Sequence, residues 1–202
     1  WAFCGLALSF PLSLVIYLYA YTGLIGDPGS LPGADLVEKL SELLWLVSLP
    51  LTTVVLFLLF PNGRVRAAGE RRVLRLAGAG TAIAAIGLFI TPRLYGEFER
   101  FDNRLGVEPA WVSDTMLTVG FLAILAAVVA SFVALIRRFR RSRGDERQQM
   151  KWFVTAAALV FTIQIPVFIV ETDSDVVPLL ESLVVLAVPG SVGDAIVKYR
   201  IY

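Results

Sequence analysis

The sequence predicts an all-α fold, a polytopic bundle of six transmembrane helices with both ends of the chain on the cytoplasmic side. Three observations lead to this prediction. The 202 residues are 57% hydrophobic and only 17% charged, and the mean hydropathy of +0.74 is too high for a water-soluble domain of this size. Apolar stretches of membrane-spanning length recur along the chain, and the basic residues gather in alternate segments between them.

Six apolar stretches have about the length of roughly 20 residues that a helix needs to cross the hydrocarbon core. In chain order they are 1–21, 43–60, 73–90, 115–136, 152–170 and 176–197. We expect helices because a backbone surrounded by lipid must satisfy its hydrogen bonds within the segment. The connections are short, so residues 1–202 are predicted to form a single membrane domain.

The orientation follows from the distribution of charge. Fourteen of the eighteen Lys and Arg residues fall in the segments 61–75, 137–151 and 198–202, whereas thirteen of the seventeen acidic residues fall on the opposite side. Short loops rich in Lys and Arg stay in the cytoplasm. The sequence therefore predicts a multi-pass protein of the plasma membrane with these three segments inside the cell.

The predicted second and third helices each carry a distinctive residue pattern. Gly78, Gly80 and Gly87 recur among alanines in the third helix, and such small residues let two membrane helices approach closely. We therefore expect this helix to pack against a neighbour. Pro50 lies inside the second helix, where its missing N–H removes one helical hydrogen bond. A local irregularity is expected there.

The outer segment after the third helix has the spacing of a short amphipathic helix. Its apolar residues, at one helical face, are Leu94, Phe98, Phe101 and Leu105, and its opposite face carries Glu97, Arg100, Asp102 and Arg104. Such a helix lies on the membrane surface. It is interpreted either as an interfacial anchor or as a lid over an extracellular pocket.

The last outer segment and its flanks are acidic. They carry Glu171, Asp173, Asp175 and Glu181, hard oxygen ligands that could bind a divalent cation or a cationic peptide. Their spacing matches no EF-hand loop. Solvated acids that complete the charge asymmetry explain the segment equally well.

Several kinds of chemistry are excluded within these residues. Histidine is absent and Cys4 is the only cysteine, which removes most haem ligation, HExxH zinc sites, Ser-His-Asp hydrolysis and any intrachain disulfide. We expect no catalytic residue, no cofactor and no metal. The basic stretch 137–151 suits anionic lipid head groups, and nothing indicates binding of nucleic acid.

Few polar groups lie inside the predicted spans. Gln164 is the deepest of them, and together with Pro166, Glu181 and Asp194 it could line a path through the bundle. Polar residues within a membrane are candidates for function. A small-solute transporter or channel is therefore one alternative function for the chain, and a passive membrane anchor is another.

Three stretches resemble a known family. They are Leu59-Phe-Pro-Asn-Gly-Arg64, Arg143-Gly-Asp-Glu-Arg-Gln-Gln-Met-Lys-Trp152 and Lys198-Tyr-Arg-Ile-Tyr202. They are similar to the Phe-Pro-Asp-Gly-Arg, Gly-Asp-Glu-Arg-Gln-Gln-Leu-Lys-Trp and Arg-Tyr-Arg-Leu-Tyr stretches in the N-terminal membrane region of actinobacterial sensor histidine kinases. The departures, at Asn62, Met150, Lys198 and Ile201, are chemically mild.

This resemblance implies that the chain is the sensory input of a two-component sensor histidine kinase. It implies a homodimer, a cytoplasmic kinase domain that follows in the same longer protein, and a response regulator downstream. The candidate extracellular sensing residues are Glu97, Arg100, Asp102, Glu171, Asp173, Asp175 and Glu181. The candidate output residues, at the end of the last helix, are Lys198, Tyr199, Arg200 and Tyr202.

Overall fold

The structure is a computed structural model, and it describes residues 2–60, 63–65, 67–144, 147, 150, 151, 153–155 and 158. Within these residues the chain is all-helical, as predicted. It divides into two compact units, one of Trp1–Leu59 with Arg64–Phe132 and one of Phe60–Gly63 with Val133–Tyr202. Most of the predicted fifth helix (152–170) and all of the predicted sixth helix (176–197) lie outside the described residues.

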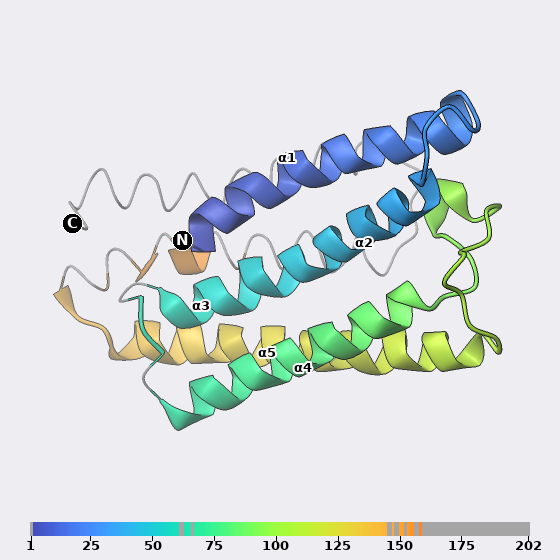
Figure 1. Cartoon of the computed structure of the whole chain (residues 1–202). Coiled ribbons are helices and arrows are strands. Elements are labelled where there is room, and N and C mark those ends of the chain that lie inside the picture. The colour runs from blue at the N-terminus through green and yellow to red at the C-terminus, as the bar shows by residue number, and fades with distance from the viewer. Residues whose placement is uncertain are drawn as a thin grey trace. The chain divides into compact units, whose positions relative to one another are not determined.

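The first unit begins with a helical hairpin. Helix α1 (Ala2–Tyr21) continues through the π-helical turn η1 (Thr22–Gly26), and α2 (Ala34–Pro50) then runs back alongside α1 (Figure 1). Gly23 lies where the two helices meet, because a Cβ at this position would come within 2.8 Å of the Ala34 Cβ. The hairpin is closed by a turn in which Gly29 and Gly33 have positive φ angles of 88° and 68°, a conformation that glycine adopts without strain.

Helix α2 begins at Ala34, so the predicted start at Leu43 is wrong. The preceding segment, residues 22–42, is expected from sequence to be a connection, and the structure shows that four of its five charged residues lie on the first turns of the helix. After Pro50 the helix widens into the π-helical turn η2 (Leu51–Val55) and continues as α3 (Leu56–Leu59). This is the irregularity expected at Pro50, since proline cannot donate the helical hydrogen bond.

Helices α4 (Ala68–Phe89) and α5 (Trp111–Arg141) are both longer than the predicted 73–90 and 115–136. Each extends beyond its apolar stretch into charged turns. Glu70 stabilises the start of α4, because its Oε2 accepts a hydrogen bond from the Ala67 N–H at 3.2 Å. Arg138, Arg140 and Arg141 occupy the last turn of α5, where cations interact favourably with the helix dipole.

Helices α4 and α5 approach each other closely through glycines, as expected for the small-residue surface. A Cβ added at Gly120 of α5 would lie 2.5 Å from the Ala84 N of α4, and one at Gly80 would lie 2.9 Å from the Gly120 O. Gly87 is similarly enclosed, by Leu117 and Met116. Gly78 is different, because a Cβ there would meet nothing within 4 Å. The packing surface therefore includes Gly80 and Gly87 but not Gly78.

Three described helical stretches are long and apolar enough to cross a membrane. They are Ala34–Leu59, Ala68–Phe89 and Trp111–Arg141, with 26, 22 and 31 residues. At about 1.5 Å per residue the shortest of them spans about 33 Å, which matches a hydrocarbon core of about 30 Å. Leu12–Gly26 is a shorter apolar helical stretch. The chain thus has the character of a membrane protein.

Candidate functional site

The connections after α1 and after α4 lie at the same end of the first unit (Figure 1). We call this region, made of residues 13–42 and 88–114, the loop end. Its apolar centre consists of Ala20, Leu94 and Phe98, which are at most 2% exposed. Tyr17 packs edge-on against Phe98 with ring centroids 5.8 Å apart. Its hydroxyl donates a hydrogen bond to Glu97 Oε2 at 3.2 Å, so α1 is attached to the segment after α4.

The segment after α4 is not the amphipathic helix that its spacing predicts. It contains only the short 3₁₀-helix η3 (Gly96–Phe98) and then turns back, with an isolated bridge between Arg93 and Asp102. Leu94 and Phe98 are buried, but the last residue of the predicted apolar face, Leu105, is 42% exposed. The expectation of a surface helix was therefore wrong, although two of its apolar residues do point inward.

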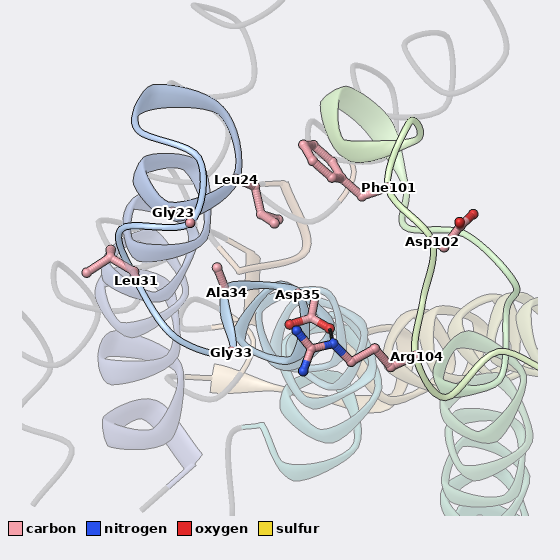
Figure 2. A pocket seen from close by; sticks show the side chains of 10 residues that line it. Gly23, Leu24, Leu31, Gly33, Ala34, Asp35, Phe101, Asp102 and Arg104 are labelled. Atoms are coloured by element: carbon pink, nitrogen blue, oxygen red, sulfur yellow. Dashed lines mark ion pairs between the residues drawn. The ribbon is translucent and has the colours of Figure 1, made fainter.

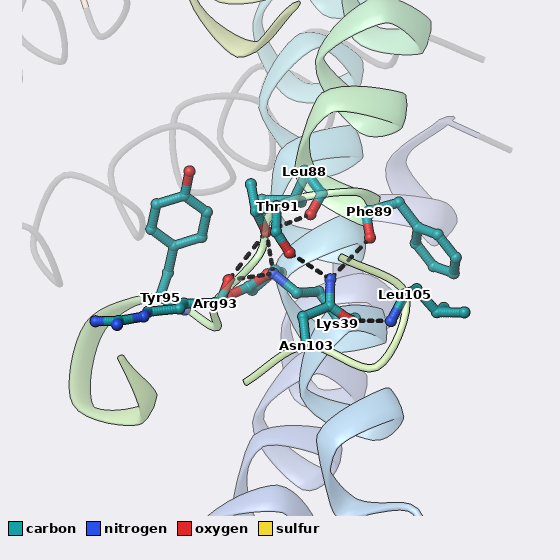
Figure 3. A network of polar contacts seen from close by, with 9 residues as sticks. Lys39, Leu88, Phe89, Thr91, Arg93, Tyr95, Asn103 and Leu105 are labelled. Atoms are coloured by element: carbon teal, nitrogen blue, oxygen red, sulfur yellow. Dashed lines mark hydrogen bonds and ion pairs between the residues drawn. The ribbon is translucent and has the colours of Figure 1, made fainter. Parts of the chain in front are cut away.

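Asn103 explains why this segment folds back. Its side-chain Nδ2 donates hydrogen bonds to the Phe89 carbonyl at 2.9 Å and to the Thr91 carbonyl at 2.7 Å. Its Oδ1 accepts a hydrogen bond from the Leu105 N–H at 3.0 Å. One buried amide thus satisfies three backbone groups that a helix would otherwise satisfy. Figure 3 shows these contacts beside the network described next.

A fully buried lysine connects α2 to the same segment (Figure 3). Lys39 is 1% exposed, and its Nζ lies 2.8 Å from Glu42 Oε2 and 2.9 Å from Thr91 Oγ1, with the Arg93 carbonyl farther away at 3.4 Å. The other carboxylate oxygen of Glu42 accepts a hydrogen bond from the Tyr95 N–H at 3.1 Å. Because a buried charge is tolerated only when it is paired and hydrogen-bonded, this network fixes α2 against residues 91–95.

Two further groups border this network. Glu38, one turn before Glu42, is 5% exposed, and its Oε2 is buried with no hydrogen-bond partner in the structure. The Lys39 Nζ also lies 5.2 Å from the centre of the Tyr95 ring. Burial raises the pKa of the Tyr95 phenol, and the negative charges of Asp114 and Glu42 raise it further. The loop end therefore concentrates charged groups that are partly or fully removed from water.

A pocket of about 250 Å³ opens beside this network, between residues 23–35 and residues 101–104 (Figure 2). The pocket is lined by Gly23, Leu24, Gly29, Leu31, Gly33, Ala34, Asp35, Phe101, Asp102 and Arg104. Asp35 and Arg104 join the two sides by an ion pair in which Arg104 Nε lies 2.7 Å from Asp35 Oδ2. Leu24 and Phe101 face the space between the segments, whereas the carboxylate of Asp102 points away from the ion pair (Figure 2).

The predicted sensing residues have different positions. Asp102 is one of the residues that line the pocket, although its carboxylate points away from the ion pair (Figure 2). Glu97 accepts a hydrogen bond from the Tyr17 hydroxyl and does not line the pocket. Arg100 is exposed, and its guanidinium lies 5.0 Å from the centre of the Phe101 ring. The remaining four, Glu171, Asp173, Asp175 and Glu181, lie outside the described residues, as do the output residues Lys198, Tyr199, Arg200 and Tyr202.

Sequence reasoning missed three residues that shape this site, namely Asp35, Lys39 and Asn103, and it placed Arg104 on the polar face of a predicted surface helix without naming it as a sensing residue. A partial signal was present. Asp35, Glu38 and Glu42 recur at spacings of three and four, which places them on one face of a helix. The distant partners of Asp35 and Glu42, which are Arg104 and Tyr95, lie more than fifty positions away in the chain, so the spacing alone could not identify the network.

The second unit joins residues that are far apart in sequence. The Phe60 ring stacks on the Phe153 ring with centroids 4.2 Å apart, and the Arg138 side chain donates a hydrogen bond to the Phe60 carbonyl. Phe60 belongs to the stretch 59–64, and Phe153 directly follows the stretch 143–152.

Comparison with known proteins gives no relative. No family model, no curated protein and no solved structure matches the chain.

Proposed function

We propose that this chain is the membrane-embedded input domain of a signal-transduction protein, a two-component sensor histidine kinase, in the plasma membrane. The observation that carries the proposal is the pocket at the loop end, which lies between residues 23–35 and residues 101–104 and whose two sides are joined by the ion pair of Asp35 and Arg104. The segregation of basic residues supports an extracellular position for this end. The similarity of three stretches to sensor kinases supports the kinase output.

A stimulus in the pocket would act on two parts of the chain that are each firmly held. Asp35 lies in the first turn of α2, which Lys39 anchors. Arg104 follows Asn103, which holds the opposite segment. A ligand that changes the distance between Asp35 and Arg104 would therefore act on the first turn of α2 and on residues 101–104. In this proposal α2 and its neighbours pass the displacement to the last helix and its output residues 198–202.

The required energy is compatible with a buried site. Moving a two-state protein from 1:99 to 99:1 takes a differential binding energy of about 5.5 kcal/mol. An exposed surface ion pair provides less than about 1 kcal/mol. Removing one partner of a buried charge pair, such as that of Lys39 and Glu42, costs about 3–5 kcal/mol. The loop end therefore contains an interaction of the right order to bias two arrangements of the bundle.

The proposal is tested by joining the chain through Tyr202 to a histidine kinase core and measuring autophosphorylation in lipid nanodiscs. We expect Asp35→Asn and Arg104→Gln each to change the phosphorylation rate several-fold. Asp27→Asn is the matched control, since Asp27 is an exposed acid of the same connection that does not line the pocket. The homodimer is checked in the same sample by cross-linking.

Three results would contradict the proposal. If both pocket variants fold, as judged by their circular dichroism, and phosphorylate at the wild-type rate, the pocket is not an input site. If the chain instead carries a solute across liposomes, and neutralising Asp194 stops the flux, the transporter alternative replaces it. Retention of output after exchange of the whole bundle for unrelated helices would indicate a passive anchor.

A further inference from the structure

The pocket at the loop end contains a carboxylate that is nearly buried and a guanidinium that is not. The side chain of Asp35 is 11% exposed, whereas that of Arg104 is 71% exposed. Asp35 is therefore part of the wall of the pocket, and the long side chain of Arg104 approaches it from the solvent side. The burial of Asp35 requires a cation beside it, because a carboxylate removed from water without a partner is costly.

The charge around the pocket favours a cationic guest. Of the charged residues in the lining, Asp35 and Arg104 face each other, and the carboxylate of Asp102 points away from them (Figure 2). The described acids of the loop end are Asp27, Asp35, Glu38, Glu42, Glu97, Glu99, Asp102, Glu108 and Asp114, and its basic residues are Lys39, Arg93, Arg100 and Arg104. A surface with this excess of negative charge raises the local concentration of cations.

The walls and the size of the pocket favour an organic cation over a metal ion. Leu24 and Phe101 face the space between the two segments (Figure 2) and supply apolar surface, which suits a hydrocarbon chain or ring and offers a metal ion no ligand. In the part of the chain that the structure describes, no three metal-ligating side chains come together. The volume of about 250 Å³ limits the guest to a compact molecule.

We propose that the pocket binds a compact organic ammonium ion, with Asp35 as its counter-ion and Arg104 as a tethered competitor that occupies Asp35 when the pocket is empty. The inference rests on the proposed function and names the ligand class of the same site. The Arg104 side chain can be displaced, because it is itself largely exposed and an incoming ammonium ion supplies the cation that the buried Asp35 needs. Its release would detach residues 101–104 from the start of α2.

The test measures binding to the full chain in nanodiscs of zwitterionic lipid, with empty nanodiscs as the blank. The probe is n-butylammonium, followed by ligand-observed NMR, and sodium butyrate is the anionic counterpart of similar size. We expect saturable binding of n-butylammonium and none of butyrate. Asp35→Asn should abolish binding, and Asp27→Asn should leave it unchanged.

Arg104→Gln distinguishes the two possible ligand charges. Removal of a competing cation should tighten n-butylammonium binding about two- to fivefold, the factor expected for loss of an exposed ion pair. If Arg104 were instead the binding group of an anion site, this substitution would abolish binding of butyrate. Because Gln keeps much of the side chain, this variant remains informative should Asp35→Asn fail to fold.

The inference is overturned if n-butylammonium shows no saturable binding, if butyrate binds in its place, or if Asp35→Asn binds as the wild type does. These outcomes leave the proposed function standing when the pocket variants still change autophosphorylation. Conversely, binding of the ammonium probe without any change of phosphorylation refutes the proposed function and leaves the ligand class intact.

Discussion

Replacing Lys39 by methionine is the most direct test of the buried network. Methionine fills a similar volume but removes the ammonium, which has no exposed surface. Glu42, whose side chain is 12% exposed, then keeps only its hydrogen bond from the Tyr95 N–H. Breaking a buried ion pair by removing one partner costs about 3–5 kcal/mol. Since Glu42 retains some contact with water, we expect Lys39→Met to lower the free energy of unfolding by about 3–4 kcal/mol.

The loss should come mainly from the unpaired charge of Glu42 and less from the missing lysine contacts. The double variant Lys39→Met with Glu42→Gln leaves no charge at this position, and the glutamine oxygen can still accept the Tyr95 N–H. We therefore expect the double variant to be more stable than Lys39→Met alone, with a coupling energy of about 1–3 kcal/mol. A purely structural loss of packing would not be reversed in this way.

The free energies are measured by reversible denaturation in mixed micelles, with tryptophan fluorescence as the signal. Lys151→Met is the control, because Lys151 is exposed and surface substitutions usually change stability by less than about 0.5 kcal/mol. The reasoning is refuted if Lys39→Met is within about 1 kcal/mol of the wild type, or if the effects of the two substitutions simply add.

Three further changes test other parts of the first unit by the same denaturation assay. Gly120→Ala should lower the free energy of unfolding by about 1–3 kcal/mol, because the added Cβ would meet the α4 backbone. Gly78→Ala is the control and should be neutral or slightly stabilising, because the space around Gly78 is open. Equal effects of the two substitutions would contradict the close packing of α4 against α5. Asn103→Ala should cost about 2–4 kcal/mol, since three backbone groups lose a partner of about 1 kcal/mol each, and a loss below 1 kcal/mol would mean that water replaces the amide. The pKa of the Tyr95 phenol is raised above 10.0 in the folded protein, so the folded protein holds this proton more tightly than the unfolded chain does. The free energy of unfolding should therefore decline as the pH rises through about 10. Tyr95→Phe should remove that part of the decline.

The helix interiors could be predicted from sequence, and so could the ends at Tyr21, Leu59 and Phe89, but the ends that carry charged residues could not. The apolar runs that identify a membrane helix stop where the charges begin, so the second helix was placed from residue 43. Its charged first turns, from Ala34 onward, are helical because their side chains turn inward and find partners there. Hydropathy alone cannot distinguish a solvated loop from a helix whose charges are buried and paired, because charged residues lower the mean hydropathy of a segment equally in both cases.

The segment after α4 illustrates a competing principle. Its apolar residues have helical spacing, yet Gly96 has a φ of 63° and the Asn103 amide satisfies backbone groups on both sides of a turn. Local hydrogen bonding of this kind competes with the helix. The glycine and the asparagine were visible in the sequence as turn residues. Which carbonyls the asparagine would reach depended on the position of α4 and could not be read from the chain.

The contacts of the first unit differ in kind, and this difference bears on how a signal could travel. Helices α4 and α5 meet through glycines that leave no room for even one added carbon atom, so this pair resists small adjustments. At the loop end, α1 and α2 meet the segment after α4 through discrete polar contacts, such as those of Tyr17, Lys39 and Asp35. A discrete polar contact is either made or exchanged for another. An interface built from such contacts therefore has separate arrangements and no continuous range between them. A ligand that competes for Asp35 would therefore move α1 and α2 against a fixed α4–α5 pair.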